Sequence, residues 1–419
     1  MSDQAVVSLG NFLLTVTLAR YMSKTEYGVY VVTLGAFLVG NAIHSGLLAY
    51  PISVLGAHIP DEEIHQYAAN GLLVTYAFAL PVAAVLGTTI WALSKNRELA
   101  LAVIAAMFCW QTHETLRRCL MSRLRHGVTI FGDAVTYLGQ IALVVFLAYR
   151  HSELVAQTGF LIIALASLVG ALVHLSVIGL RYPNFTAAIA LGRESIKLGR
   201  WSLFSILGYW GTVSLLPWAL ALKSLAEVAN YQTMMNVVQV VNPVMFSVSN
   251  LVVPSVAHEM KKPDGEKRAL RVTLVHMLQG MVLLAPLFLG LLIVPGPVMR
   301  ALYGHARGYA ENDAVMKVLV FGAILTYTGH ILNAYFLGRK SVEIVGRSQV
   351  AATITAAICA IALIPKWDLM GAAMSFVAMG IARNGLLIAA LRQGSSQEVG
   401  SISRDLRVEV SPIPPTDGI

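Results

Sequence analysis

Four charged residues lie where one apolar run ends and the next begins. Glu114, Arg117 and Arg118 fall within one helical turn, at spacings of three and four, and Asp133 follows near the start of the next apolar run. Guanidinium groups stay charged when partly dried and can donate two hydrogen bonds at once to a phosphate. Two interpretations stay open: an ion-pair network that neutralises charge, or an anion site in which Asp133 competes with the ligand for an arginine and so acts as a gate.

Another arginine, Arg383, stands well inside an apolar run and is followed by Asn384. A charged residue in such a place costs a few kcal/mol on insertion scales and usually faces a bundle interior or water. We therefore expect Arg383 and Asn384 to bind a ligand, with a structural ion pair as the alternative. Arg20, near the end of the first apolar run, is expected to reach the membrane interface along its own stem, and ion pairing or gating is its alternative role.

Amide side chains follow one face of a later apolar run. They recur at spacings of three or four and are Gln232, Asn236, Gln239 and Asn242. An earlier run carries a similar pair, Asn41 and His44, one turn apart. Amides bind helices to one another in lipid, and they also suit sugar hydroxyls. Helix packing and a ligand-facing wall are therefore equally open.

Single histidines in apolar runs carry a weaker signal. His174, His276 and His330 have no acidic partner at helical spacing, so each is expected to be a hydrogen-bonded packing residue, with proton relay as the alternative. The cysteines also lie in or beside apolar runs, without metal-ligand spacing, and are Cys109, Cys119 and Cys359. We expect neither a disulfide nor a metal site.

The elements that must position these residues are membrane helices. Of 419 residues, 57% are hydrophobic and 12% are charged, and the mean hydropathy is +0.69. Soluble domains are about 25% charged, and a helix of about 20 apolar residues crosses a bilayer. The sequence predicts an all-α polytopic membrane protein of about twelve spans. The predicted spans are 5–22, 28–49, 68–93, 99–116, 128–149, 155–179, 201–222, 228–256, 272–298, 314–338, 342–364 and 370–391.

The basic residues predict the orientation of these spans. If both termini are cytoplasmic, the cytoplasmic loops carry about twice as many Lys and Arg as the opposite loops, as the positive-inside rule requires. The loops near Arg123, Lys197, Lys262 and Arg347 are then cytoplasmic. The net charge of +8 follows from this topology and favours contact with anionic lipids, and it gives no reason to expect nucleic acid. The first span shows no cleavable signal and is expected to stay in the mature protein.

A hydrophilic turn occurs twice. "SKTEYGVY" at 23–30 and "SLAEVANY" at 224–231 share Ser, Glu and Tyr at a displacement of 201 positions. This displacement carries the first span onto the seventh, so the two halves are expected to be parallel repeats about an axis along the membrane normal. We predict six-helix bundles at 1–180 and 201–391, a basic cytoplasmic linker at 181–200 and a disordered cytoplasmic tail at 392–419.

The opening "DQAVVSLGNFLLTVTLARYMSKTEYGVYVV" resembles the start of polysaccharide flippases in the multidrug/oligosaccharidyl-lipid/polysaccharide exporter superfamily. Their first span ends in a similar Leu-Ala-Arg stretch before a Ser-x-x-Glu-aromatic-Gly turn. "ETLRRCLMSRLRHGVTIFGDAVTY" is similar to the connection between their fourth and fifth spans. The resemblance covers about the first 150 residues, and topology and the repeated turn extend it.

The resemblance implies a flippase that moves polyprenyl-pyrophosphate-linked oligosaccharide units across the bacterial inner membrane by alternating access, for surface polysaccharide (exopolysaccharide or O-antigen) biosynthesis. Expected partners are the lipid-linked substrate, membrane lipids and polysaccharide assembly enzymes, and the chain is expected to be a monomer.

Two other classes are open. A multidrug or cation antiporter would share the fold, but it needs a buried carboxylate, and the spans offer few beyond Glu114 and Asp133. A sugar polymerase or glycosyltransferase needs a sizeable external loop, whereas the predicted outer loops are short. No G-x-x-x-x-G-K-[ST] loop occurs. We expect no enzymatic activity and no cofactor.

Overall fold

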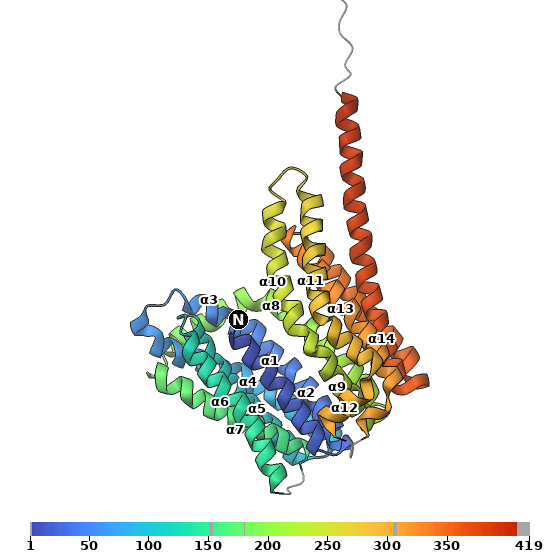
Figure 1. Ribbon diagram of the computed structural model, residues 1–419. Coiled ribbons are helices and arrows are strands. Elements are labelled where there is room, and N and C mark those ends of the chain that lie inside the picture. Colours follow the sequence, from blue (N-terminus) through green and yellow to red (C-terminus); the bar gives the residue numbers. More distant parts are fainter. Residues whose placement is uncertain (1, 151–153, 180, 305–307, 409–419) are drawn as a thin grey trace, which may run out of the picture. The chain divides into compact units, whose positions relative to one another are not determined.

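The computed structural model describes the chain except for residues 1, 151–153, 180, 305–307 and 409–419. Its described residues form helices and no strands (Figure 1). The predicted all-α class is confirmed.

The first half of the chain contains helices that run from Ser2 to Ala221. They are α1 (Ser2–Tyr21), α2 (Lys24–His44), the π-helix η1 (Ser45–Ala49), α3 (Tyr50–Gly56), η2 (Asp61–Glu63), α4 (Ile64–Ser94), α5 (Arg97–Met121), α6 (His126–Tyr149), α7 (Ala156–Ile178) and α8 (Phe185–Ala221). The second half contains α9 (Leu225–Val238), η3 (Gln239–Val241), α10 (Asn242–Glu259), α11 (Gly265–Ile293), α12 (Pro295–Tyr303), η4 (Tyr309–Glu311), α13 (Asp313–Gly338) and α14 (Val342–Val408).

Ten segments of the described chain are long and apolar enough to cross a membrane. Nine of them correspond to nine of the predicted spans one for one, and the tenth, Val342–Gln393, covers the last two. Helix α1 holds the remaining predicted span, 5–22. The expectation of about twelve spans therefore agrees with the structure.

The last two predicted spans both lie within α14. A single non-helical residue separates them. Asp368 has φ 42° and ψ −117°, which is not helical. A Cβ on Gly371 would lie 2.6 Å from the carbonyl carbon of Leu363, although residues eight apart in a straight helix are separated by about 12 Å. The chain therefore turns back on itself at Asp368.

The repeated hydrophilic turn begins a helix in both places. Ser23 precedes α2, and its hydroxyl accepts a hydrogen bond from the Glu26 N–H at 3.2 Å. Ser224 precedes α9 and accepts from the Glu227 N–H at 3.4 Å. A helix leaves its first N–H groups without partners inside the helix, so a serine at this position satisfies one of them. The Ser-x-x-Glu pattern is therefore a helix start signal used twice.

Helices α2 and α9 also pack against each other. The Asn236 amide on α9 donates a hydrogen bond to the Tyr27 hydroxyl on α2 at 3.0 Å. Gly28 allows this approach, since a Cβ there would lie 2.7 Å from the Leu225 carbonyl carbon. The superposition of residues 1–180 on 201–391 stays a prediction.

The predicted linker at 181–200 is not an irregular loop. Asn184 caps helix α8, with its side chain accepting from the Ala187 N–H at 3.1 Å, and the helix continues to Ala221. The basic residues of 181–200 therefore extend the start of a span, because no proline interrupts the backbone between Phe185 and Arg200. Helix α8 packs closely on η1, where a Cβ on Gly46 would lie 2.6 Å from the Leu203 Cα.

The disorder of the tail at 392–419 stays a prediction. Helix α14 continues to Val408, and the first proline of the tail, Pro412, lies beyond that point. A polar segment without proline can continue as a helix from the span before it. Residues 409–419 lie outside the described part of the chain.

Two compact units can be recognised by their internal contacts. The first comprises Met1–Pro243, Leu287–Val320 and Ala356–Phe376, and the second comprises Val244–Pro286, Phe321–Thr355 and Val377–Ile419. This division differs from the predicted one at 181–200, and the bundles 1–180 and 201–391 stay a prediction.

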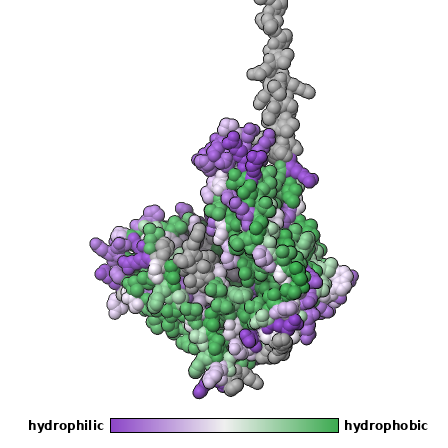
Figure 2. Space-filling model, viewed as in Figure 1, coloured by the Kyte–Doolittle hydropathy of each residue, from purple (hydrophilic) through white to green (hydrophobic). Residues whose placement is uncertain are grey.

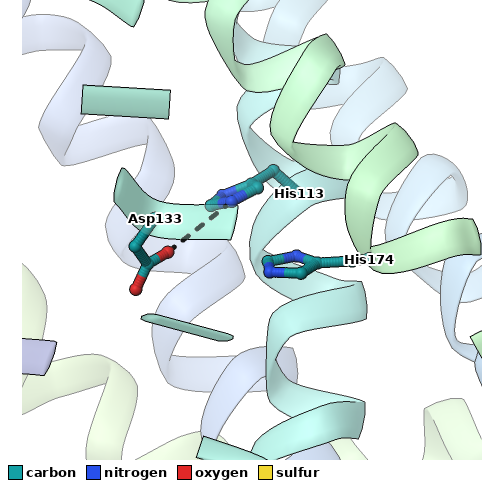
Figure 3. Close-up of side chains that lie close together, drawn as sticks. All are labelled: His113, Asp133 and His174. Atoms are coloured by element: carbon teal, nitrogen blue, oxygen red, sulfur yellow. Dashed lines mark ion pairs between the residues drawn. The ribbon is translucent and has the colours of Figure 1, made fainter. Parts of the chain in front are cut away.

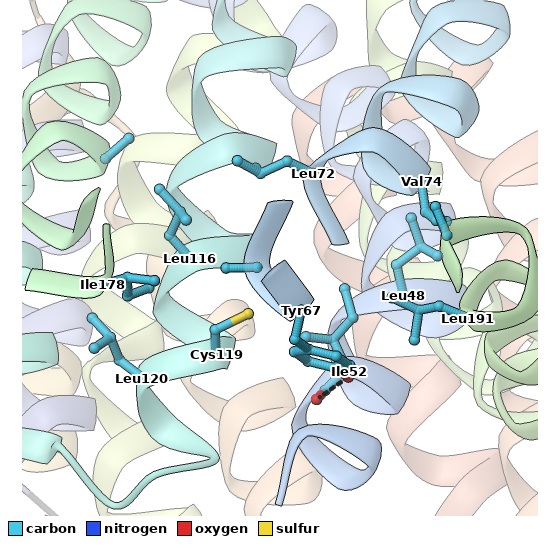
Figure 4. Close-up of a cluster of buried hydrophobic side chains, with 13 residues drawn as sticks. Leu48, Ile52, Tyr67, Leu72, Val74, Leu116, Cys119, Leu120, Ile178 and Leu191 are labelled. Atoms are coloured by element: carbon cyan, nitrogen blue, oxygen red, sulfur yellow. Dashed lines mark hydrogen bonds between the residues drawn. The ribbon is translucent and has the colours of Figure 1, made fainter. Parts of the chain in front are cut away.

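An apolar cluster in the first unit packs α3, α4, α5, α7 and α8 together, with Ile52, Tyr67, Leu116 and Ile178 among its members (Figure 4). The Tyr67 hydroxyl donates to the Ile52 carbonyl at 3.0 Å, which satisfies its polar end inside the cluster.

The outer surface of the helices is apolar, as lipid requires. Figure 2 shows hydrophobic residues along the helix faces, while hydrophilic residues gather at helix ends. On α11, for example, Leu278 is 64% exposed and Leu283 is 67% exposed. Such exposed apolar area is unusual for a soluble protein and identifies the surface that faces lipid.

The caps lead to a test of the repeated turn. We expect Ser23→Ala and Ser224→Ala each to lower the free energy of unfolding by about 1 kcal/mol, because each leaves one helix N–H without its partner. Thermal or denaturant unfolding in detergent micelles would measure the loss. Ser255→Ala is the matched control, since Ser255 only bonds back to the Leu251 carbonyl within α10 and alanine favours a helix there. A loss at Ser255 equal to that at Ser23 would contradict the capping role.

Candidate functional site

A buried ion-pair network joins α5 and α6, as the first interpretation of its four charged residues predicts. The Arg117 Nε lies 2.8 Å from Asp133 Oδ2, and its Nη1 lies 3.4 Å from Glu114 Oε2. The Arg118 Nε lies 2.5 Å from Glu114 Oε1. The Asp133 side chain is 1% exposed, and those of Arg117 and Glu114 are each 11% exposed.

Helical spacing explains how this network forms. Glu114 lies three and four residues before Arg117 and Arg118 on α5, so one carboxylate reaches both guanidinium groups. Asp133 comes from the second turn of α6 and takes the other side of Arg117. Two carboxylates and two guanidinium groups balance in charge, which makes their burial tolerable. Arg118 is the most accessible member, with 32% of its side chain exposed.

Two histidines extend this network, and Figure 3 shows them beside Asp133. The His113 Nε2 on α5 lies 3.6 Å from Asp133 Oδ1. The ring of His174 on α7 stacks on the ring of His113, with the centroids 4.7 Å apart and 22° between the planes. His174 has no acidic partner at helical spacing, as expected, but Asp133 approaches it from another helix.

His113 was missed by the sequence reasoning. The signal that could have found it is the run Gln111 to Arg118, in which polar residues stand side by side inside an apolar span. Two glycines make room for the rings. A Cβ on Gly132 would lie 2.7 Å from His174 Cδ2, and a Cβ on Gly170 would lie 2.8 Å from His113 Cδ2.

Within the described chain, His113, Asp133 and His174 form a group whose side chains are close enough to hold a metal ion. Each offers one ligand atom, and these atoms lie within 4.8 Å of one another. A metal binds in the plane of an imidazole ring, on the lone pair of a nitrogen, at about 2.0–2.1 Å. Stacked rings direct their lone pairs side by side rather than toward one point. The arrangement therefore does not fit a metal ion, and the absence of a metal site stays a prediction.

Polar residues of α2, α5 and α9 bond across the helix contacts, as the Asn236 amide does to Tyr27. The Gln111 amide on α5 donates to Asn41 on α2 at 2.8 Å, and His44 lies 3.0 Å from the Thr115 hydroxyl. On α9, Gln232 donates to Asn236 at 2.8 Å. Helix packing thus accounts for the contacts of Asn41, His44 and Asn236. The remaining candidates are Gln239 in η3 and Asn242 at the start of α10, both half-buried, and Arg20, which is exposed at the end of α1.

Arg383 and Asn384 lie in the second unit with a further amide from α13. With the Asn333 amide oriented so that its oxygen faces Arg383, this oxygen accepts from the guanidinium Nε at 3.2 Å. The Asn384 amide donates to the carbonyls of Leu325 and Gly380, each at 2.8 Å. The buried Asn384 Oδ1 has no hydrogen-bond partner. His330, on α13 near Asn333, packs edge-on against Phe246.

The structure therefore brings the candidates together in two groups. The first unit holds the ion-pair network, the histidines and the amides of α2, α5 and α9, and the second unit holds Arg383, Asn384 and Asn333.

Comparison with known proteins places the fold. No family model and no curated protein matches the sequence. Solved structures do match: lipid II flippase MurJ in an inward closed conformation has a TM-score of 0.70 at 12% identity, covering 93% of this chain and 86% of that one. An inward-facing multidrug resistance MATE family transporter of the MOP superfamily has a TM-score of 0.71 at 13% identity, covering 95% and 96%. A MOP superfamily transporter from Pyrococcus furiosus has a TM-score of 0.60 at 12% identity, covering 95% and 93%.

At these identities the comparisons establish the fold. The chain shares the fold of these solved structures over nearly its whole length, which is the fold that the resemblance of the first spans implied.

The buried ion pair can be tested by removing one partner or both. We expect Asp133→Leu to lower the free energy of unfolding by about 3–5 kcal/mol, because it leaves a buried guanidinium without its carboxylate. The double variant Asp133→Leu/Arg117→Met should lose clearly less, because neither charge is then left alone. Membrane abundance and melting temperature in detergent measure both.

The matched control for this test is Arg347→Ala. Its ion pair with Glu343 is 76% and 75% exposed, so its loss should change little. A double variant no more stable than Asp133→Leu alone would show that the pair is not the source of the loss.

Proposed function

We propose that this protein is a flippase that moves polyprenyl-pyrophosphate-linked oligosaccharide units across the bacterial inner membrane for surface polysaccharide biosynthesis. The transporter fold supports a membrane carrier without an enzymatic role. The choice of an anionic, sugar-bearing cargo rests on the polar residues inside the helices.

The observation that carries this proposal is the pairing of the buried charges. Among the described residues the buried carboxylates are Glu114 and Asp133, and arginine contacts both. A carrier of cationic drugs needs a carboxylate that is open to its cargo, whereas these two are already matched. Arg383 contacts the amide of Asn333 and is followed in the sequence by Asn384, so amide groups that suit a sugar surround a guanidinium that suits a phosphate. This balance favours an anionic cargo over a cationic one.

The chemistry of such a cargo fits these groups. A pyrophosphate must be kept out of hydrocarbon, and a planar guanidinium can donate two hydrogen bonds to it while staying charged. The unpartnered Asn384 Oδ1 is a buried acceptor that a sugar hydroxyl could satisfy. Arg118, the most accessible arginine of the network, is a second place for a phosphate. The polyprenyl tail can stay in lipid throughout.

Alternating access follows from the fold expected of two related bundles, which expose a shared site first to one side and then to the other. In this proposal both termini are cytoplasmic, the lipid-linked substrate and membrane lipids are the partners together with polysaccharide assembly enzymes, and the chain acts as a monomer. A multidrug antiporter is the competing function, and it predicts that drug resistance rather than surface polysaccharide depends on the chain.

Replacement of Arg383 tests the cargo. We expect Arg383→Ala to insert and fold normally while surface polysaccharide is lost, because the phosphate loses its guanidinium. Arg383→Lys should keep only part of the export, since it retains the charge and loses the planar fork. The measurement compares membrane abundance with surface polysaccharide for each variant in a deletion strain.

Arg347→Ala is the matched control, because this arginine lies in the arm of α14 before the turn at Asp368 and its guanidinium pairs with Glu343 at the surface. Normal export by a well-expressed Arg383→Ala protein would refute the phosphate role of Arg383. A parallel loss of abundance and export would instead indicate a structural ion-pair role.

Cysteine labelling tests the orientation. In a variant without Cys109, Cys119 and Cys359, a cysteine at Lys262 should resist an impermeant thiol reagent in intact cells, because the turn between α10 and α11 is placed in the cytoplasm by its basic residues. A cysteine at Lys366, on the opposite side, should react. The reverse pattern would invert the proposed topology.

A further inference from the structure

The stacked pair His113 and His174 has features that packing alone does not explain. The His174 side chain is fully buried, and neither ring nitrogen has a hydrogen-bond partner. A buried polar group left unsatisfied costs about 1–3 kcal/mol. Gly132 and Gly170 nevertheless leave the space that the two rings occupy. The structure thus provides space for the rings while the ring nitrogens of His174 have no hydrogen-bond partner, and this combination points to a small ligand that binds there.

We propose that His113 and His174 together bind one proton, and that this proton draws Asp133 away from Arg117. The inference deepens the proposed function and rests on it in one respect: it assigns the released Arg117 to the phosphate of the cargo. The proton comes from water, adds to the lone pair of a ring nitrogen and breaks no bond within the protein.

The geometry of Asp133 supports this coupling. One of its oxygens, Oδ2, lies 2.8 Å from the Arg117 Nε, and the other, Oδ1, lies 3.6 Å from the His113 Nε2. At 3.6 Å the neutral ring makes no full hydrogen bond, whereas a charged N–H···O⁻ bond is about 2.7–2.9 Å long. Protonation therefore pulls the carboxylate toward His113. The same movement lengthens its bond to Arg117.

The charge balance selects a proton rather than a metal ion. Two carboxylates and two guanidinium groups already cancel in this network, with the rings neutral. A proton adds one positive charge, shared by two rings and placed against Asp133. A divalent metal ion would add two, next to the Arg117 guanidinium, and the stacked rings do not converge on one point.

The groups that face the two rings come from several helices. The charged ones are Glu114 and Arg117 on α5 and Asp133 on α6. His44 is occupied by the Thr115 hydroxyl at 3.0 Å, and His65 lies near Gly179 at the far end of α7. Imidazole is the side chain that ordinarily titrates near neutral pH. Asp133 is the carboxylate that reaches the pair.

Proton binding can be measured without any transport. The purified full chain, labelled in its histidines, would be titrated by nuclear magnetic resonance between about pH 5 and about pH 8. We expect ring signals that shift with pH and that disappear together in His113→Gln and in His174→Gln. His276→Gln is the control, because His276 lies on α11, in the other compact unit, and its ring bonds to Gln279.

The coupling to Arg117 is measured with inorganic pyrophosphate as the probe. Its affinity for the wild-type chain should rise about fivefold or more from pH 8 to pH 5, since protonation releases Arg117. His174→Gln should lose this rise, because its Arg117–Asp133 pair stays closed. Asp133→Asn should show the same pH dependence of pyrophosphate affinity as His174→Gln, because it has no carboxylate for the proton to move. Buffer effects on pyrophosphate itself cancel in these comparisons.

Three results would overturn the proposal. The first is a pair of rings that stay neutral down to about pH 5. The second is an equal rise in pyrophosphate affinity in wild type and His174→Gln. The third is a stoichiometric metal ion that copurifies with the wild type and is absent from His174→Gln. Failure of pyrophosphate to bind at any pH would count against the proposed cargo instead, and the titration of the rings would still decide the proton site.

Discussion

No water is available inside a bilayer to hydrogen-bond a backbone amide, and the rest of this structure follows from that constraint. Each span must satisfy its own N–H and C=O groups, so the described chain is helical and its irregular residues gather at helix ends. The same constraint acts on side chains. Polar groups in the spans find partners on neighbouring helices, as Asn41 does with Gln111 and Asn236 does with Tyr27. Where a partner is missing, as at His174, the cost requires an explanation.

The spans and helix starts could be predicted because they depend on local chemistry. Apolar runs of sufficient length locate the helices, and the Ser-x-x-Glu pattern marks the start of α2 and of α9. The network of Glu114 with Arg117 and Arg118 was also visible, since all three lie on one turn of α5. The helical form of 185–200 was not visible, because polar composition alone does not distinguish a loop from a solvent-exposed helix.

The site depends on contacts that no local spacing encodes. His113, Asp133 and His174 come from three successive helices, and only the packing of α5, α6 and α7 brings them together. Asn333 reaches Arg383 in the same way, from α13 to α14. Glycines are the sequence signal for such close approaches, but Gly132 and Gly170 are recognised as spacers only once their neighbours are known. The sequence thus identifies which residues are unusual in a membrane span, and the fold decides which of them act together.

The sharp reversal at Asp368 has a consequence for how the chain enters the membrane. Lys366 and Asp368 are the charged residues at this turn, and both are exposed. A translocating hairpin with so small a hydrophilic tip has few charges to carry through the lipid. The two spans of α14 on either side of Asp368 can therefore insert together as a helical hairpin. The Lys223 ammonium lies 2.9 Å from the Pro365 carbonyl and 3.4 Å from Asp368, and so fastens the tip to the turn that precedes α9.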